Sequence, residues 1–131
     1  MDFAVDWTKR IDFDFLRKER TKCLNEQIKK HGLDAILCFK AENIRYMTGY
    51  RPLWWPISFL TRNAGIMAPD KEPLLFPTSG CYERCRESMY WMKKENIRPL
   101  ATMEDPGIVE VEIKKKFIPA FEELGIAKGK I

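Results

Sequence analysis

The most distinctive candidates for chemistry in this chain lie on one loop, Tyr50-Arg-Pro-Leu-Trp-Trp-Pro56. Arg51 could hold a substrate carboxylate in a bidentate fork, and Trp54 and Trp55 could cover an apolar ring or a quaternary cation. The two prolines exclude a helix or an inner strand, so the segment is predicted to be a loop. Adjacent tryptophans on a loop either pack on the domain's own surface or contact a ligand or partner. Both interpretations stay open.

Four nearby polar residues are weaker candidates. Arg62 and Asn63 are polar in an otherwise apolar predicted strand and could line the same pocket wall. Arg45 and Tyr46 follow a predicted buried strand, where such side chains more often hold the backbone than contact a ligand.

The sequence offers little for a metal site or a nucleophile. A metal site needs several convergent His, Cys, Asp or Glu ligands. The single histidine, His31, lies at a predicted helix end, where it would stabilise the helix dipole. Cys81 and Cys85 could supply two ligands, but no suitably spaced histidine or second cysteine pair completes a site. Ser79 is interpreted as part of a helix cap, with no histidine base nearby. We expect no catalytic residue, metal or cofactor in this chain.

A buried strand is predicted to place the loop at one edge of a sheet. Residues 35–39 form an apolar run of strand length, with the composition of a strand buried on both faces. Asn43 suits the cap of a single helical turn through Met47, and Gly49 supplies the positive φ that ends it.

The remaining elements follow from caps, turns and periodicity. A helix should run from Asp12 or Asp14 to Lys30 and lie on the sheet through an apolar stripe that Arg20 interrupts. The other expected elements are a hairpin of residues 57–68 and 74–76 with its turn at 69–73, a helix at 81–94 capped by Thr78 or Ser79, a short strand at 97–100, and a helix at 109–124 that Pro119 should kink near Lys115.

This order of elements predicts an α/β fold. We expect a mixed, largely parallel central sheet with a hairpin, covered by helices on both faces. The 131 residues suit one domain, 1–131, in which residues 1–11 form an irregular arm whose aromatic side chains dock on this domain or on a partner subunit.

Composition excludes several classes of protein. The net charge of +4 comes from interspersed acidic and basic residues, which argues against nucleic-acid binding. The sequence has no apolar run long enough for a membrane span and no secretory signal, so we expect a cytoplasmic protein with no membrane partner and with reduced cysteines.

One motif carries a family resemblance. The segment Asn43-Ile-Arg-Tyr-Met-Thr-Gly49, preceded by Leu33-Asp-Ala-Ile-Leu37 and followed by Pro73-Leu-Leu-Phe76, resembles the amino-terminal domain of the creatinase, prolidase and Xaa-Pro aminopeptidase family. The carboxy-terminal catalytic domain of these metallopeptidases has the pita-bread fold. The resemblance covers the chain from about Phe13 to its end.

The resemblance implies a non-catalytic role. In the family two aspartates, a histidine and two glutamates of the catalytic domain bind a divalent metal pair, and none of these positions exists here. The resemblance implies a homodimer in which the amino-terminal domain reaches over the partner's pocket and encloses a small peptide or other small substrate. Arg51, Trp54 and Trp55 are the residues at comparable places. Residues 125–131 have the pattern of a turn entering a new strand, so we expect the natural chain to continue into its own catalytic domain.

Other functions remain open. Within the family, Trp54 and Trp55 and the aromatic arm differ from ordinary prolidases, so a creatinase-like or dimethylsulfoniopropionate-lyase-like member is an alternative. A complete, stand-alone binding or assembly module is a rival of another class. A flavodoxin-like domain ranks last, because the glycine-rich phosphate turn is missing. Whether the reading frame continues past Ile131 into spaced Asp, Asp, His, Glu and Glu residues separates the first two classes.

Overall fold

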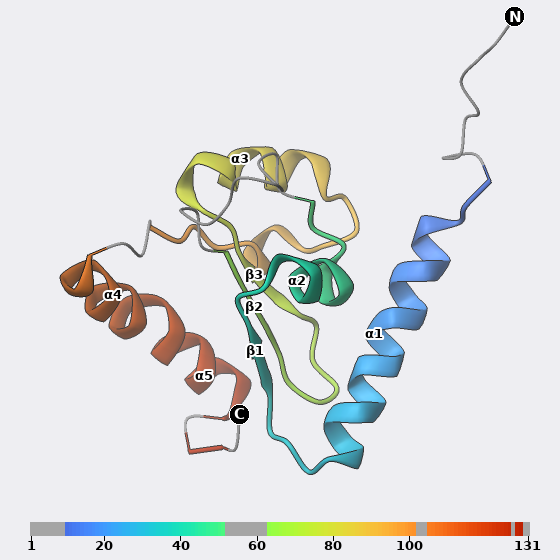
Figure 1. Ribbon diagram of the computed structural model, residues 1–131, viewed down its shortest axis with the longest axis horizontal. Helices are drawn as coiled ribbons and strands as arrows, with labels where there is room; N and C mark the ends of the chain where they lie inside the picture. The colour runs from blue at the N-terminus through green and yellow to red at the C-terminus, as the bar shows by residue number, and fades with distance from the viewer. Residues whose placement is uncertain (1–9, 52–62, 102–104, 127, 130–131) are drawn as a thin grey trace, which may run out of the picture.

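The computed structural model describes residues 10–51, 63–101, 105–126 and 128–129. Within them the order of elements is α1 (Phe13–Lys30), β1 (Ile36–Cys38), α2 (Ala41–Thr48), β2 (Ala64–Met67), β3 (Leu74–Phe76), α3 (Ser79–Ser88), the 3₁₀ turn η2 (Lys94–Asn96), α4 (Pro106–Glu112), the π-helical segment η3 (Ile113–Phe117) and α5 (Ile118–Leu124). Figure 1 shows α4 and α5 on one side of the strands and α1 and α2 on the other.

Both ends of α1 agree with the prediction. The Asp12 side chain caps the helix by accepting a hydrogen bond of 2.9 Å from the Phe15 backbone N–H. At the other end His31 is the C-cap, and Gly32 follows with a φ of 60°. These are local signals, a capping carboxylate and a glycine in the left-handed region.

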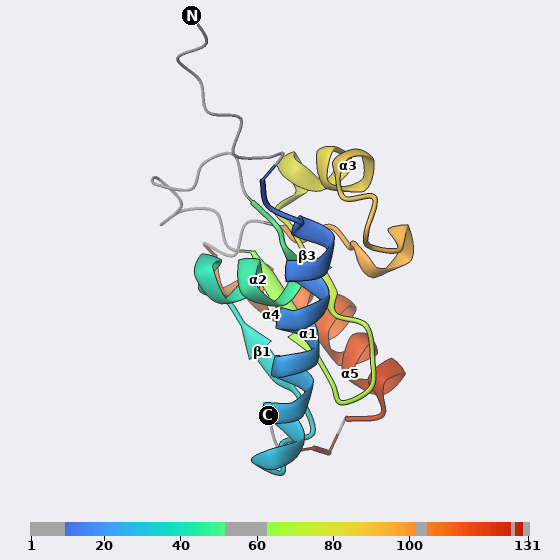
Figure 2. The same ribbon diagram turned by 90° about the vertical axis from the view of Figure 1, so that its right-hand side faces the viewer.

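The predicted packing of α1 is only partly right. Ile28 is the one residue of this helix that is fully buried, and it packs with Met47 of α2 and Met67 of β2. Figure 1 shows the first half of α1, whose face is interrupted by Arg17 and Arg20, leaning away from the strands, and Figure 2 shows the helix in front of the sheet from its outer side. The helix is therefore held on α2 and on one end of the sheet instead of lying along the sheet.

The start of α2 differs from the prediction, and its end agrees. The helix begins at Ala41, with Lys40 as N-cap, so Asn43 lies inside the helix and does not cap it. The Lys40 side chain makes no capping hydrogen bond, so no capping residue marks this start in the sequence. Gly49 ends the helix in the left-handed conformation, with a φ of 77°.

Across the described ranges the sheet has three strands in the order β1-β2-β3, and both pairings between them are antiparallel. Parallel pairing within the described residues is limited to isolated bridges between Leu75 and Ile97 and between Thr78 and Leu100. The expected largely parallel sheet is therefore not confirmed. β1 lies at an edge and its residues are only half-buried, so the prediction of a strand buried on both faces is wrong.

The hairpin is confirmed in its described part. Ile66 pairs with Leu74 and Ala64 with Phe76 across a turn that contains Asp70, which has a φ of 58°. Residues 57–62 of the predicted strand lie outside the described residues.

The last two predicted helices both differ in detail. α3 follows the expected N-cap, Thr78, but ends at Ser88, six residues before the predicted Lys94. The predicted disturbance near Lys115 takes the form of the π-helical segment η3, in which the Ile118 N–H donates to the Ile113 carbonyl. This wider turn precedes Pro119, which has no N–H to continue an α-helical ladder, and Pro119 then lies in the first turn of α5.

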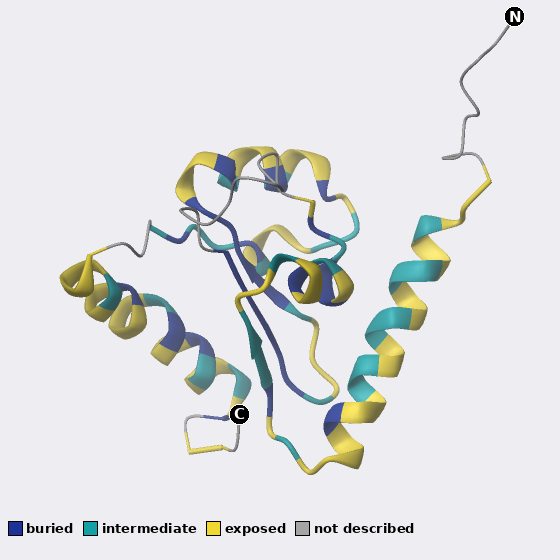
Figure 3. Cartoon of the chain, in the orientation of Figure 1, coloured by how far each residue is buried: buried dark blue, intermediate teal, exposed yellow. Residues whose placement is uncertain are grey.

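Side chains on the two faces of the sheet enter different cores, as the period of two requires. On one face Ile66, Leu74 and Phe76 pack against Phe117 and Ala120 of the C-terminal helices. The other face packs against different helices through Leu75, Ile44, Cys81 and Cys85. Figure 3 shows the strands β2 and β3 as the buried centre of the molecule. Helices therefore cover both faces, as predicted.

No helix within the described ranges is both long and apolar enough to cross a membrane.

Candidate functional site

The backbone turn after α2, which we call the Gly49 corner (residues 48–51), is fixed by local hydrogen bonds. The Gly49 N–H donates to the Arg45 carbonyl at 2.8 Å. The Thr48 hydroxyl donates to the Ile44 carbonyl at 2.7 Å and accepts from the Tyr50 N–H at 3.1 Å. The direction in which the chain leaves α2 is thereby set by the Thr-Gly-Tyr sequence itself.

A buried polar network holds Tyr50 beneath this corner. Its ring is 4% exposed, and its hydroxyl donates to Asn63 Oδ1 at 3.5 Å. The same Asn63 oxygen accepts the Thr78 N–H at 3.0 Å. Burial raises the pKa of Tyr50, so the phenol stays protonated and remains a donor. Asn63, a weak candidate for the pocket wall, thus has a buried structural role.

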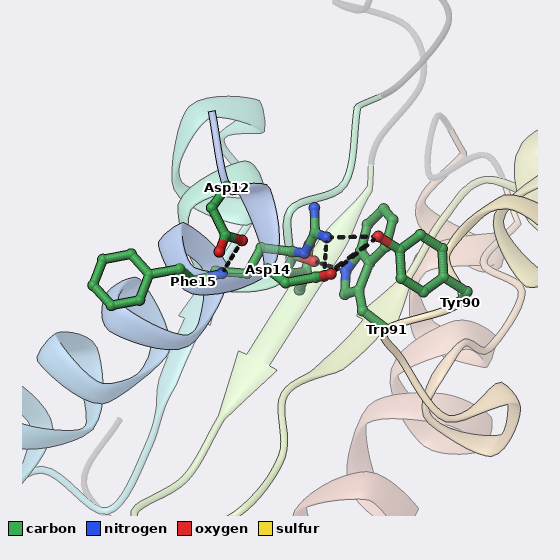
Figure 4. A network of polar contacts seen from close by, with 7 residues as sticks. Asp12, Asp14, Phe15, Tyr90 and Trp91 are labelled. Atoms are coloured by element: carbon green, nitrogen blue, oxygen red, sulfur yellow. Dashed lines mark hydrogen bonds and ion pairs between the residues drawn. The ribbon is translucent and has the colours of Figure 1, made fainter. Parts of the chain in front are cut away.

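A second network joins the first half of α1 to the segment after α3. The Trp91 indole N–H donates to the Thr48 carbonyl at 2.9 Å, and Arg17 Cζ lies 3.9 Å from the centroid of the Trp91 ring. Arg17 also pairs with Asp14, and the Tyr90 hydroxyl lies 3.3 Å from Asp14 Oδ1. Figure 4 shows Asp14, Tyr90 and Trp91 converging at this contact.

Of the three main candidates, Arg51, Trp54 and Trp55, the structure describes Arg51. It is exposed and lies at the border of two hollows of about 160 Å³ and about 230 Å³. Trp54, Trp55 and Arg62 lie outside the described residues, so their meeting with Arg51 stays a prediction. The same holds for the aromatic residues Phe3 and Trp7 of the predicted arm.

The larger of these two hollows, which we call the arginine pocket, brings together four arginines from separate elements. Arg17 and Arg20 come from α1, Arg45 from α2, and Arg51 from the Gly49 corner. The indole of Trp91 forms part of the wall. Sequence reasoning missed Arg17, Arg20 and Trp91. The one signal in the sequence was Arg20, which interrupts the apolar stripe of α1.

A third hollow, of about 490 Å³, lies between α1 and the turn of the β2–β3 hairpin. Its apolar part is formed by Met47, Met67 and Met92. Both acidic and basic side chains line it, and Asp70 of the lining is bonded to Lys29 at 2.6 Å near the hairpin turn. Because charges of both signs line it, this hollow shows no preference for a ligand of either charge.

The described residues do not fit a dinuclear metal site. Nowhere in the described ranges do three or more His, Cys, Asp or Glu side chains come close enough to hold a metal ion. Cys81 and Cys85 are buried on α3, and burial raises the pKa of the Cys85 thiol to about 11. A thiol that stays protonated at neutral pH is a poor ligand and a poor nucleophile.

The chain is an α/β domain with a small antiparallel sheet and helices on both faces. Hydrogen bonds of the Gly49 corner fix the point at which the loop after α2 begins. A comparison with known protein families matches residues 20–129 to the Creatinase/Prolidase N-terminal domain, and the chain belongs to this family. The match confirms the resemblance seen in the sequence. No curated protein and no solved structure matches the chain.

Proposed function

We propose that this chain is the non-catalytic N-terminal domain of a dinuclear-metal hydrolase resembling Xaa-Pro peptidases. In this proposal it mediates dimerisation, and Arg51, Trp54 and Trp55 form part of the wall around a small peptide substrate. The divalent metal pair belongs to a C-terminal catalytic domain. The observation that carries the proposal is the family match over residues 20–129.

The Gly49 corner supports the proposed role of Arg51. Hydrogen bonds of Thr48, Gly49 and Tyr50 fix the backbone immediately before it, while the Arg51 side chain is exposed. A fixed backbone that presents an exposed guanidinium is suited to holding a carboxylate in a chosen orientation, because little ordering is needed on binding.

The first test uses the chain alone. The purified 131-residue protein, incubated with Xaa-Pro dipeptides and Mn²⁺, Co²⁺ or Zn²⁺, should release no proline. Sedimentation equilibrium should show a dimer. Metal-dependent turnover by this chain would refute the non-catalytic assignment, and a monomer at all concentrations would refute the assembly role.

The second test uses the coding sequence downstream of Ile131. The proposal expects a catalytic domain there, and in the two-domain protein Arg51→Gln and Trp55→Ala should raise KM about tenfold without changing the metal content. Lys115→Gln, on the opposite face of the sheet, is the matched control and should change neither KM nor the metal content. Unchanged kinetics in both pocket variants would assign Trp55 to packing and Arg51 to the surface.

A further inference from the structure

The arginine pocket has an unusual charge composition. Its described lining contains four guanidinium groups, those of Arg17, Arg20, Arg45 and Arg51, and no carboxylate. Guanidinium groups stay protonated at every physiological pH, so the positive charge of this pocket is permanent. Like charges that share one small hollow repel each other, and an anion bound among them would remove that repulsion.

The described partners of Arg17 and Arg20 leave part of the hydrogen-bonding capacity of these two guanidinium groups available. Arg17 is neutralised in part by Asp14 and stacks on Trp91, and Arg20 Cζ lies 5.6 Å from the centroid of the Tyr46 ring. An aromatic face attracts a guanidinium without accepting its in-plane N–H bonds. Arg17 Nε is buried and has no hydrogen-bond acceptor among the described residues.

The size of the pocket selects among anions. Its volume is about 230 Å³, which is below the roughly 300–1,000 Å³ of pockets for drug-sized ligands. A water molecule takes a share of about 30 Å³, so the hollow has room for a small oxyanion with a few waters. Gly49 also lines the pocket, and because it has no side chain, the Arg17 and Trp91 side chains can lie directly against the backbone of the corner there.

We propose that the arginine pocket is a binding site for a small oxyanion, a phosphate or a short dicarboxylate, held by bidentate contacts from Arg20 and Arg51 against the wall formed by Arg17 and Trp91. Fork geometry matches both kinds of anion. The site goes beyond the proposed role in enclosing a substrate. Three of its four arginines come from helices that the proposed function does not use, and its binding needs no catalytic domain.

Isothermal titration calorimetry of the purified chain tests this site with inorganic phosphate and, separately, with succinate, each against sodium chloride of equal ionic strength. We expect saturable binding of one anion per chain. Saturation by phosphate alone or by succinate alone supports the site and identifies its ligand chemistry, and saturation by both supports a general oxyanion site. No saturation by either anion would overturn the proposal.

Variants locate the binding. Arg20→Gln and Arg51→Gln should each weaken the affinity at least about tenfold, as expected for loss of a charge-assisted, bidentate contact. Arg51→Lys keeps the positive charge and removes only the bidentate hydrogen-bonding geometry of the guanidinium, so it should show a smaller loss of affinity. Lys115→Gln removes the same charge from the other face of the sheet and should weaken the affinity less than about twofold.

Two results would contradict the assignment. An equal loss in Lys115→Gln and in Arg51→Gln would show that net charge alone attracts the anion. Unchanged affinity in both Arg20→Gln and Arg51→Gln would place the bound anion elsewhere. Circular dichroism shows which variants are folded, and Arg51→Gln, at an exposed position, keeps the test decisive if Arg20→Gln unfolds. Failure of this site leaves the predicted catalytic-domain kinetics unaffected, so the two proposals fail separately.

Discussion

At Gly49 two requirements for glycine coincide. The residue has a φ of 77°, which disfavours any side chain, and a Cβ built there would lie 2.9 Å from Arg17 Cδ and 3.3 Å from Trp91 Nε1. The glycine therefore serves both the end of α2 and the packing of Trp91 against the corner. Only the first of these could be inferred from the sequence.

Substituting Gly49 by alanine should be more destabilising than the same change at Gly125. Both glycines have a φ of 77°, but nothing lies within 4 Å of a Cβ at Gly125. We expect a loss in the free energy of unfolding of about 1–2 kcal/mol for Gly125→Ala and about 2–4 kcal/mol for Gly49→Ala. Urea denaturation measures both, and equal losses would show that Arg17 and Trp91 move aside without strain.

At the scale of elements, the first half of α1 depends on a few contacts with the segment after α3. Trp91 stacks on Arg17 of α1, and its hydrogen bond to Thr48 of α2 holds the indole in place. Tyr90, next to it, is 75% exposed and contributes a hydroxyl near Asp14. Because only Ile28 of α1 is fully buried, the contacts with Tyr90 and Trp91 after α3 are needed to hold the first half of this helix on the domain.

Trp91→Leu should loosen α1 from the domain. The variant loses the indole hydrogen bond, the cation–π contact and part of the packing, so we expect a destabilisation of about 1–3 kcal/mol. Backbone amides in the first half of α1 should exchange faster with deuterium than in the native protein. Tyr90→Phe, which removes the exposed hydrogen bonds of the hydroxyl with Asp14 and Arg17 but keeps the ring, is the comparison variant and should change stability by less than about 0.5 kcal/mol. Unchanged exchange in α1 would mean that Trp91 is not what docks this helix.

In the whole molecule a central sheet has a hydrophobic core on each face. Near each end of α1, a carboxylate takes part in a contact between that helix and the rest of the domain. Asp14 meets Arg17 and Tyr90 near the start of α1, and Asp70 of the hairpin turn meets Lys29 and Asn25 near its end. The hydrogen bond from Arg17 lowers the pKa of Asp14, and that from Lys29 lowers the pKa of Asp70.

Mild acid should therefore weaken the attachment of α1. A carboxyl whose folded pKa is lowered stabilises the folded state above its unfolded pKa of about 3.9, and this contribution disappears as the pH falls through the folded value. Between about pH 4 and pH 2, nuclear magnetic resonance signals of α1 should shift while those of β2 and β3 persist. The Asp14→Asn/Asp70→Asn variant should lack this step, and simultaneous loss of all signals in the native protein would contradict the prediction.

Features that depend on neighbouring residues could be predicted from the sequence before the fold was known. Asp12 capped α1 where expected, Gly49 ended α2, and the Asn43–Gly49 motif with the apolar segments around it was enough to identify the family. Caps and left-handed glycines act over three or four residues, so their signals can be read without knowing the fold.

The pairing of the strands and the composition of the pockets could not be predicted in this way. The antiparallel direction of β1 against β2, the end of α3 at Ser88 and the meeting of Arg17 with Trp91 all depend on contacts between distant segments. No glycine or proline marks the end of α3, so nothing local predicted that Trp91 would leave the helix. The arginine pocket joins three elements for the same reason: long-range packing brings their side chains together, and the spacing along the chain does not record it.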